Sequence, residues 1–157
     1  MDWRPDRVAQ GAQPVVILVD TTVWIDWFKG NDTAHVLALE RLIGEHEDLC
    51  VCGVILTEVL QGIRDDKDYA IVAARFQSFV YLPMGQITFT KAAELYRTLR
   101  RKGVTIRNAV DCMIAAVAIE HDIPLLQNDR DFIPIVQHCR LKNFDIHPYT
   151  SNHKQSP

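Results

Sequence analysis

Four acidic residues stand beside apolar runs at widely separated places in the chain. They are Asp20, Glu58, Asp111 and Asp129. Mg²⁺ prefers oxygen ligands, binds one or two carboxylates directly and keeps several of its waters. A metal held in this way can bind a phosphodiester oxygen and lower the pKa of a bound water. If the fold brings the four carboxylates together, the expected chemistry is metal-dependent hydrolysis.

Each acid taken alone also has an ordinary structural explanation. Acidic residues favour helix N-termini, where they cap the helix or interact with its dipole. Asn108 is a candidate cap with Asp111 at the third helical position, and Asp20 and Asp129 are candidate caps of the helices after them. These two explanations, capping and catalysis, stay open for any single residue.

The apolar surroundings of two acids favour the metal explanation. Glu58 lies in the run VILTEVL and Asp111 in the run AVDCMIAA. Burying an ionised carboxylate is costly unless something pairs with it. No lysine or arginine lies within four residues of Glu58, whereas Arg107, four residues before Asp111, could pair with it. Several carboxylates with few cations nearby are what a hard divalent cation needs.

Strands and helices that would position these acids alternate along the chain. Apolar runs predict strands at 15–19, 49–52, 80–82 and 124–127, and a last edge strand at 144–147. Helical spacing predicts helices at 21–28, 33–45, 54–61, 66–79, 90–102 and 109–120. The alternation predicts an α/β fold with a mostly parallel sheet and helices on both faces. Ligands of such sheets bind beyond the carboxyl ends of the strands, which is where the acids are expected.

The composition limits the classes of protein and of metal site. The 157 residues fit one domain, and a hydrophobic content of 48% is enough for a core. The net charge of -3 gives no strong field to attract nucleic acid, although a bound metal would bring its own positive charge. Four cysteines without a C-x-x-C pair and six scattered histidines do not favour zinc. The early apolar run is too short for a membrane span and no signal peptide is recognisable, which favours a cytoplasmic protein.

Four segments in order resemble the signatures of the PIN domain family. They read ILVDTTVWID at 17–26, TEVLQG at 57–62, DCMIAA at 111–116 and LLQNDRDF at 125–132. The likeness is strongest to the VapC-type toxins of bacterial toxin–antitoxin pairs and runs from about Val15 to Phe144. It implies a three-layer α/β/α fold, a ribonuclease that depends on Mg²⁺ or Mn²⁺, a homodimer, and inhibition by a cognate antitoxin protein.

The resemblance also implies roles for individual residues. The catalytic and metal-binding quartet would be Asp20, Glu58, Asp111 and Asp129. Thr21 or Thr22 matches the small hydroxyl residue that supports the first aspartate, and Asn128 matches a small polar residue beside the last acid. Asp131 is a candidate fifth metal ligand, although a turn or cap role explains it as well.

The expected function is that of an endoribonuclease, the toxin of a type II toxin–antitoxin module. Its substrate would be an RNA with an exposed loop, such as a tRNA or an rRNA, because sequence-selective proteins usually recognise single-stranded loops. RNA contacts need positive charge, and the candidates are Arg97, Arg100, Arg101, Lys102 and Arg107. A solvated helix face explains the same basic run. The expected organisation is a flexible leader at 1–14, a PIN-like nuclease domain at 15–149 and a flexible tail at 150–157.

Three other classes of protein compete with the nuclease. A phosphotransfer receiver module also binds Mg²⁺ at a strand end, but its first strand would end with two adjacent acids, and here Thr21 follows Asp20. A haloacid-dehalogenase-like phosphatase needs a second aspartate two residues after the first, and position 22 is Thr22. A catalytically inactive PIN-like binding protein is the third, and the intact set of acids argues against it.

Overall fold

Four parallel strands form the centre of the molecule. In the computed structural model, which describes residues 15–151, they are β1 (Val16–Val19), β2 (Asp48–Cys52), β3 (Val80–Leu82) and β4 (Leu125–Leu126). The strand order is β3-β2-β1-β4, and each pairing is parallel. Since all carboxyl ends in this sheet point the same way, residues that follow β1 and β4 meet at one edge. The predicted α/β fold with a largely parallel sheet is confirmed.

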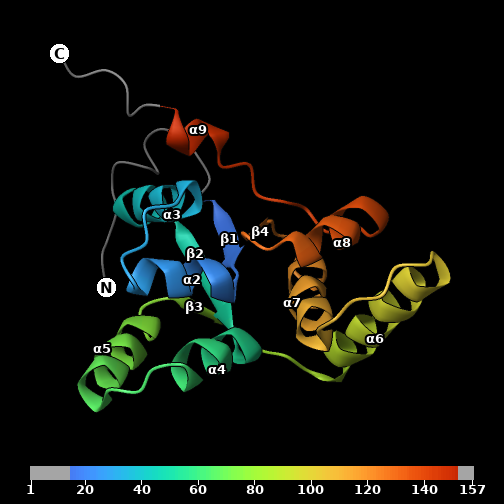
Figure 1. Cartoon of the computed structure of the whole chain (residues 1–157), viewed down its shortest axis with the longest axis horizontal. Coiled ribbons are helices and arrows are strands. Elements are labelled where there is room, and N and C mark those ends of the chain that lie inside the picture. Colours follow the sequence, from blue (N-terminus) through green and yellow to red (C-terminus); the bar gives the residue numbers. More distant parts are fainter. Residues whose placement is uncertain (1–14, 152–157) are drawn as a thin grey trace.

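Helices connect the strands and cover the sheet on both faces. They are α2 (Thr21–Phe28), α3 (Ala34–Gly44), α4 (Gly53–Gln61), α5 (Asp66–Phe76), α6 (Gln86–Arg101), α7 (Ala109–Glu120), the 3-10 turn η1 (Arg130–Phe132), α8 (Ile133–His138) and α9 (His147–Thr150). Figure 1 shows the sheet between two groups of helices, with α6, α7 and α8 on one side and α2 and α3 on the other. This is the predicted three-layer α/β/α arrangement.

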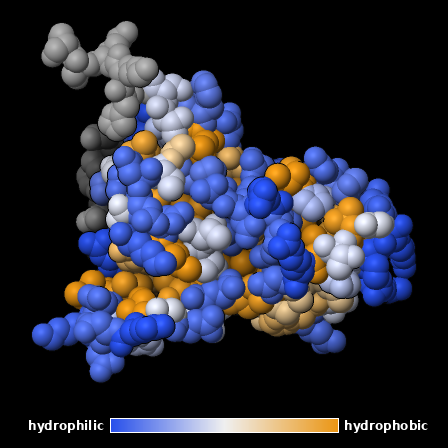
Figure 2. Space-filling model, viewed as in Figure 1, coloured by the Kyte–Doolittle hydropathy of each residue, from blue (hydrophilic) through white to orange (hydrophobic). Residues whose placement is uncertain are grey.

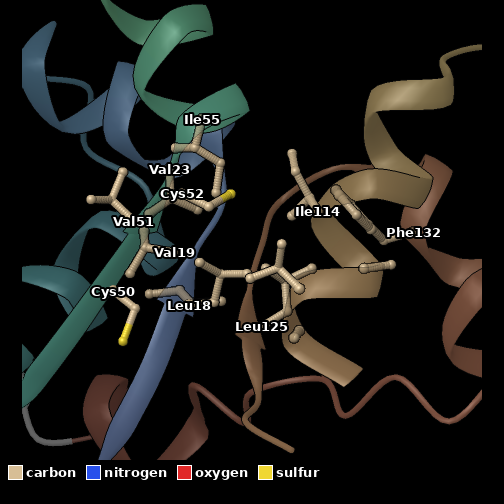
Figure 3. Close-up of a cluster of buried hydrophobic side chains, with 14 of the residues drawn as sticks. Leu18, Val19, Val23, Cys50, Val51, Cys52, Ile55, Ile114, Leu125 and Phe132 are labelled. Carbon is tan, nitrogen blue, oxygen red and sulfur yellow. The ribbon is translucent and has the colours of Figure 1, made fainter. Parts of the chain in front are cut away.

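The core lies between β1 and the helices on its two faces. Ile17, Leu18 and Val19 are fully buried. A strand that is covered on both faces needs apolar residues at successive positions, which explains the continuous apolar run of β1. Figure 3 shows Leu18 and Leu125 from neighbouring strands facing toward Ile114 of α7 and Phe132 of η1. Burying a side chain of this size stabilises the fold by about 1.5–3 kcal/mol. The packing holds α7 firmly against the sheet, so the first turn of α7 has a fixed place beside the strand ends.

Helix α6 begins at Gln86, four residues before the predicted start at position 90. The cause is the side chain of Thr88, whose hydroxyl accepts a hydrogen bond from the backbone N–H of Gly85 at 3.2 Å. The same hydroxyl is fully buried and donates to Glu120 Oε2 at 2.6 Å. This capping contact also fixes the N-terminal end of α6 against the C-terminal end of α7, so the two helices run antiparallel.

The predicted last edge strand at 144–147 is wrong. The chain makes one isolated parallel bridge, from Leu125 to Asn143, and then turns into helix α9. The Phe144 ring packs on Tyr149 instead, with ring centroids 5.4 Å apart. The helix predicted at 66–79 ends at Phe76, and η1 and α8 were not predicted. The predicted leader at 1–14 lies outside the described residues, as does 152–157 of the predicted tail.

The surface carries hydrophobic residues in separate patches among hydrophilic ones, one of them at the lower left of Figure 2, where α5 lies. Exposed large apolar residues of this region include Tyr69 and Ile71. Among the described residues, no helix is both long and apolar enough to span a membrane. The four cysteines are free thiols, and three of them, Cys50, Cys52 and Cys112, are buried in the core.

Candidate active site

Asp20 lies directly after β1 and is 2% exposed. Its carboxylate caps α2: Oδ2 accepts hydrogen bonds from the hydroxyl of Thr22 at 2.6 Å and from the backbone N–H of Thr22 at 3.2 Å. Burial raises the pKa of Asp20 to about 6, with the charge of Glu58 adding to the rise and the hydrogen bonds opposing it. The residue is therefore a helix cap, as its position predicts, and also a carboxyl group in a nearly dry place.

Glu58 reaches the same region from the middle of α4, which follows β2. Its side chain is partly buried, and Oε1 accepts a hydrogen bond from the hydroxyl of Thr21 at 2.8 Å. The hydroxyl of Thr21 is thus directed at Glu58, and the hydroxyl of Thr22 at Asp20. The sequence left open which threonine supports the first aspartate; in the structure this is Thr22.

Asp111 lies in the first turn of α7 and is 8% exposed. The helix is capped by Asn108, whose Oδ1 accepts from the N–H of Val110 at 3.0 Å, so Asp111 is not needed as the cap. Burial is the largest cause that raises the pKa of Asp111, to about 7; next come the charges of Asp20, Asp129, Asp131 and Glu58, in that order. The charges of the other four acids therefore act on Asp111, and these five residues form the acidic cluster; among the described residues, only Asp111, Asp129 and Asp131 form a group of three with oxygens close enough to share a metal ion.

Asp129 and Asp131 complete this cluster from the loop that follows β4. Asp129 caps η1, because its Oδ1 accepts the backbone N–H of Asp131 at 2.9 Å. One carboxylate oxygen each from Asp111, Asp129 and Asp131 lie within 4.8 Å of one another, close enough to share a metal ion. Sequence analysis identified Asp131 only as a candidate fifth acid, and the structure places its carboxylate within the same short reach of Asp111 as that of Asp129.

The cluster has no positively charged partner in the part of the chain that the structure describes. No lysine or arginine there forms an ion pair with any of the five acids. The ion pair considered between Arg107 and Asp111 is not formed; the Arg107 side chain is exposed in the loop before α7. Carboxylates held this close without cations repel one another. The donor set, all oxygen and without thiol or imidazole, fits a hard divalent cation such as Mg²⁺.

Asn128 stands beside Asp129, but its side chain does not support that acid. The residue is exposed, and within residues 15–151 its side chain takes part in no hydrogen bond. The backbone N–H of Asp129 instead donates to Oε1 of Gln127 at 2.7 Å, and Gln127 Nε2 donates to Asn143 Oδ1 at 3.0 Å. Gln127 thus orders the loop that carries the last two acids. Sequence reasoning assigned Gln127 no role; its place at the end of the predicted strand was the available signal.

The basic residues predicted to contact RNA are all exposed. Arg97, Arg100, Arg101 and Lys102 lie at the C-terminal end of α6, and Arg107 lies in the following loop. The Arg100 guanidinium lies 5.8 Å from the centre of the Tyr96 ring. Arg97 lines an apolar groove of about 350 Å³ together with Ala109 and Met113 of α7. These side chains are therefore on or beside the helix pair that carries Asp111, although none forms an ion pair with the acids.

The chain matches the family model described as the PIN domain over residues 17–135. Among curated proteins, "Ribonuclease VapC11" of Mycobacterium tuberculosis is 32% identical over 129 residues, which cover 81% of this chain and 96% of that protein. "Ribonuclease VapC1" of Methanocaldococcus jannaschii is 28% identical over 129 residues, or 82% of this chain and 87% of that protein. The region that matches the family model includes all five acids of the cluster.

Solved structures with the same fold include complexes of two proteins. VapBC2 from Rickettsia felis, bound to a DNA fragment from its promoter, aligns with a TM-score of 0.67 at 18% identity, and the alignment covers 83% of this chain and 100% of that one. FitAcB from Neisseria gonorrhoeae aligns with a TM-score of 0.64 at 23% identity over 83% of this chain and 97% of that one. At these identities the likeness supports the fold.

Proposed function

The chain belongs to the PIN domain family, and from this and the acidic cluster we propose that it is a metal-dependent endoribonuclease, the toxin of a type II toxin–antitoxin module. The observation that carries the proposal is the convergence of carboxylates from the end of β1, α4, α7 and the loop after β4, with no cation among them in the described part of the chain. Ribonucleases are among its curated relatives. The reaction is hydrolysis of an RNA phosphodiester bond.

Asp20, Glu58, Asp111 and Asp129 are the proposed catalytic and metal-binding acids, and Asp131 joins them as a ligand. Asp111, Asp129 and Asp131 have the oxygen spacing to hold Mg²⁺ or Mn²⁺. When bound, the ion would supply a Lewis acid for the phosphodiester and a lower pKa for a bound water. Since no lysine or arginine of residues 15–151 pairs with the acids, the metal-free cluster relies on protons to reduce its repulsion.

The carboxyl groups of Asp111 and Asp20 also make metal binding depend on pH. The pKa of the Asp111 carboxyl is raised to about 7 and that of Asp20 to about 6, so both carry protons during part of the time near neutral pH. Carboxylate ligands must be deprotonated to bind a metal, and metal binding releases those protons. Thr22 holds Asp20 in place by its hydroxyl and backbone N–H, so the orientation of this carboxylate is set before the metal arrives.

The experiment that tests the function uses the purified chain and total RNA. Cleavage is followed with Mg²⁺, with Mn²⁺ and with EDTA, and the cut ends are mapped to name the RNA, which we expect to be a tRNA or an rRNA with an exposed loop. We expect cleavage with either metal, none in EDTA, and none by Asp111→Asn. Asp32→Asn, an exposed acid outside the cluster, is the matched control. Full cleavage in EDTA would exclude the metal mechanism, and no cleavage of any RNA would exclude the nuclease.

We propose that a cognate antitoxin and a second copy of the chain are its protein partners, in the cytoplasm. An acidic cluster is a natural target for an arginine-bearing segment, because arginine pairs with carboxylates in bidentate geometry. The structural neighbours with this fold include a toxin–antitoxin complex from Klebsiella pneumoniae. Expression of the chain alone should arrest growth, and co-expression with the product of an adjacent small gene should restore it. Equal growth in both cases, with active protein present, would contradict the toxin proposal.

A further inference from the structure

Thr21 is almost fully buried, at 7% exposure, and its hydroxyl donates to Oε1 of Glu58 at 2.8 Å across 37 residues of sequence. Thr21 is the first residue of α2, and Glu58 lies in α4, and these two helices pack together (Figure 1). The contact therefore joins two elements of the site that the backbone does not connect directly.

This hydrogen bond restrains the side chain of Glu58. Within residues 15–151 the side chain of Glu58 accepts no other hydrogen bond and has no ion-pair partner. A glutamate side chain is long and loses considerable rotamer freedom when it is fixed. Threonine is β-branched and stiff at χ1, and its position in the first turn of a packed helix fixes the hydroxyl. One oxygen of Glu58 is thus held, and its other oxygen takes part in no hydrogen bond within residues 15–151.

The neighbouring threonine serves a different acid and is less essential to it. Asp20 accepts hydrogen bonds from the hydroxyl and from the backbone N–H of Thr22. The backbone donor remains when the hydroxyl at position 22 is removed. Glu58 has no backbone donor of this kind among the described residues, so loss of the Thr21 hydroxyl removes its hydrogen bond entirely.

We infer that Thr21 is a positioning residue that holds the Glu58 carboxylate ready for a divalent metal ion, whereas Thr22 reinforces a carboxylate that the backbone already holds. This inference rests on the proposed metal-dependent function. It assigns the two adjacent hydroxyls to two different acids and predicts unequal effects when each is removed. A residue that acts through Glu58 should also have no effect once Glu58 itself can no longer serve as a carboxylate.

The test is the affinity for Mg²⁺ and Mn²⁺, measured by calorimetry without RNA. Thr21→Val removes the hydroxyl and keeps the branched shape, Thr21→Ser keeps the hydroxyl, and Thr22→Val removes the neighbouring hydroxyl. Thr57→Val is the matched control, because Thr57 is exposed on the same helix as Glu58 and donates to the backbone of Gly53. Loss of a group that orients a metal ligand typically costs about 10–100-fold in metal affinity.

We expect Thr21→Val to weaken metal binding by about 10-fold, Thr22→Val to weaken it less, and Thr21→Ser and Thr57→Val to bind like the wild type. In a Glu58→Gln background, Thr21→Val should cause no further loss, which is the signature of two residues that act as a unit. If Thr21→Val does not fold, Thr21→Ala replaces it in the same comparison with Thr21→Ser.

Wild-type affinity in Thr21→Val, equal losses for Thr21→Val and Thr21→Ser, or full additivity with Glu58→Gln would each overturn the positioning role. These results are separable from a failure of the proposed function. A chain that binds metal and cleaves no RNA would refute the nuclease and leave the Thr21 measurement intact. A wild type that binds neither metal would refute both.

Discussion

Asp111 and Asp129 present carboxylate oxygens within 4.8 Å of each other, although one lies in the first turn of α7 and the other in the loop after β4. Two charges about 5 Å apart repel by about 3 kcal/mol at an effective dielectric near 20, before relaxation and proton uptake reduce the cost. A fold that keeps this contact without a cation is strained by the repulsion, and a bound divalent ion would relieve it.

Asp111→Asn should leave the metal-free protein as stable as the wild type or more stable. Asparagine removes one charge from the cluster and keeps the shape, and Asn108 still caps α7. In EDTA at pH 8 we expect a melting temperature equal to or about 2–4 °C above that of the wild type, corresponding to about 1 kcal/mol. Asp32→Asn is the control for an exposed charge. A variant that melts clearly lower would mean that Asp111 stabilises the fold and is not strained.

The stability of the metal-free protein should fall as pH rises from about 4 to about 8. The pKa of Asp111 is about 7 in the folded protein against an ordinary value of 3.8, so the folded state binds more protons than the unfolded state in this window. Stability then decreases with pH, and Asp20, with a pKa of about 6, contributes in the same direction. Thermal melts in EDTA at several pH values measure this. The decline should be smaller in Asp111→Asn; identical pH profiles for the two proteins would contradict the raised pKa.

Mg²⁺ should stabilise the wild type and not Asp111→Asn. At ten times the dissociation constant the gain is about 1.4 kcal/mol, or roughly 3–6 °C for a domain of this size. The affinity itself should fall as pH falls below 7, because protons on Asp111 and Asp20 compete with the ion. Melting curves with EDTA and with Mg²⁺ measure both effects. A full Mg²⁺ shift in Asp111→Asn would remove this residue from the metal site.

Asp131→Asn should weaken metal binding, as Asp129→Asn should. Both acids have an oxygen within reach of Asp111, and a turn residue alone would not need that position. Both variants keep the cap of η1, because an asparagine Oδ1 at position 129 can still accept the backbone N–H of residue 131. Calorimetric titration with Mg²⁺ measures the loss, and Asp145→Asn, an exposed acid after the isolated bridge, is the control. An unchanged affinity of Asp131→Asn for Mg²⁺ would mean that Asp131 has only a structural role.

Replacement of Arg100 and Arg101 by alanine should weaken RNA binding and flatten its dependence on salt. Each phosphate contact on a single strand contributes about 0.7 to the slope of log affinity against log salt, so two lost contacts lower it by about 1.4. Binding of uncleaved RNA to an Asp111→Asn background, measured from low to moderate salt, isolates this effect from cleavage. Lys29→Ala with Lys67→Ala is the matched control outside α6. Equal slopes would mean that the α6 residues form a solvated helix face.

Local pattern determined much of the fold. The continuous apolar run at 15–19 and the nearly all-apolar run at 109–120 could be satisfied only by burial on every side, so β1 and α7 were predictable almost to the residue. Contacts between distant residues were not predictable. The Thr88 hydroxyl that caps the start of α6 also donates to the distant Glu120, and the segment at 144–147 packs its Phe144 on Tyr149 instead of extending the sheet.

Residue types and their order predicted which acids could form the site, because parallel strands put the residues that follow β1 and β4 at one edge whatever the details of packing. How these acids are held and charged depends on the three-dimensional arrangement. It directs Thr21 to Glu58 and Thr22 to Asp20, brings Asp131 within reach of Asp111, and leaves Arg107 out of an ion pair with Asp111. The directions of these side chains, the distances between them and their burial follow from how α2, α4 and α7 pack together. This packing cannot be deduced directly from the order of residue types.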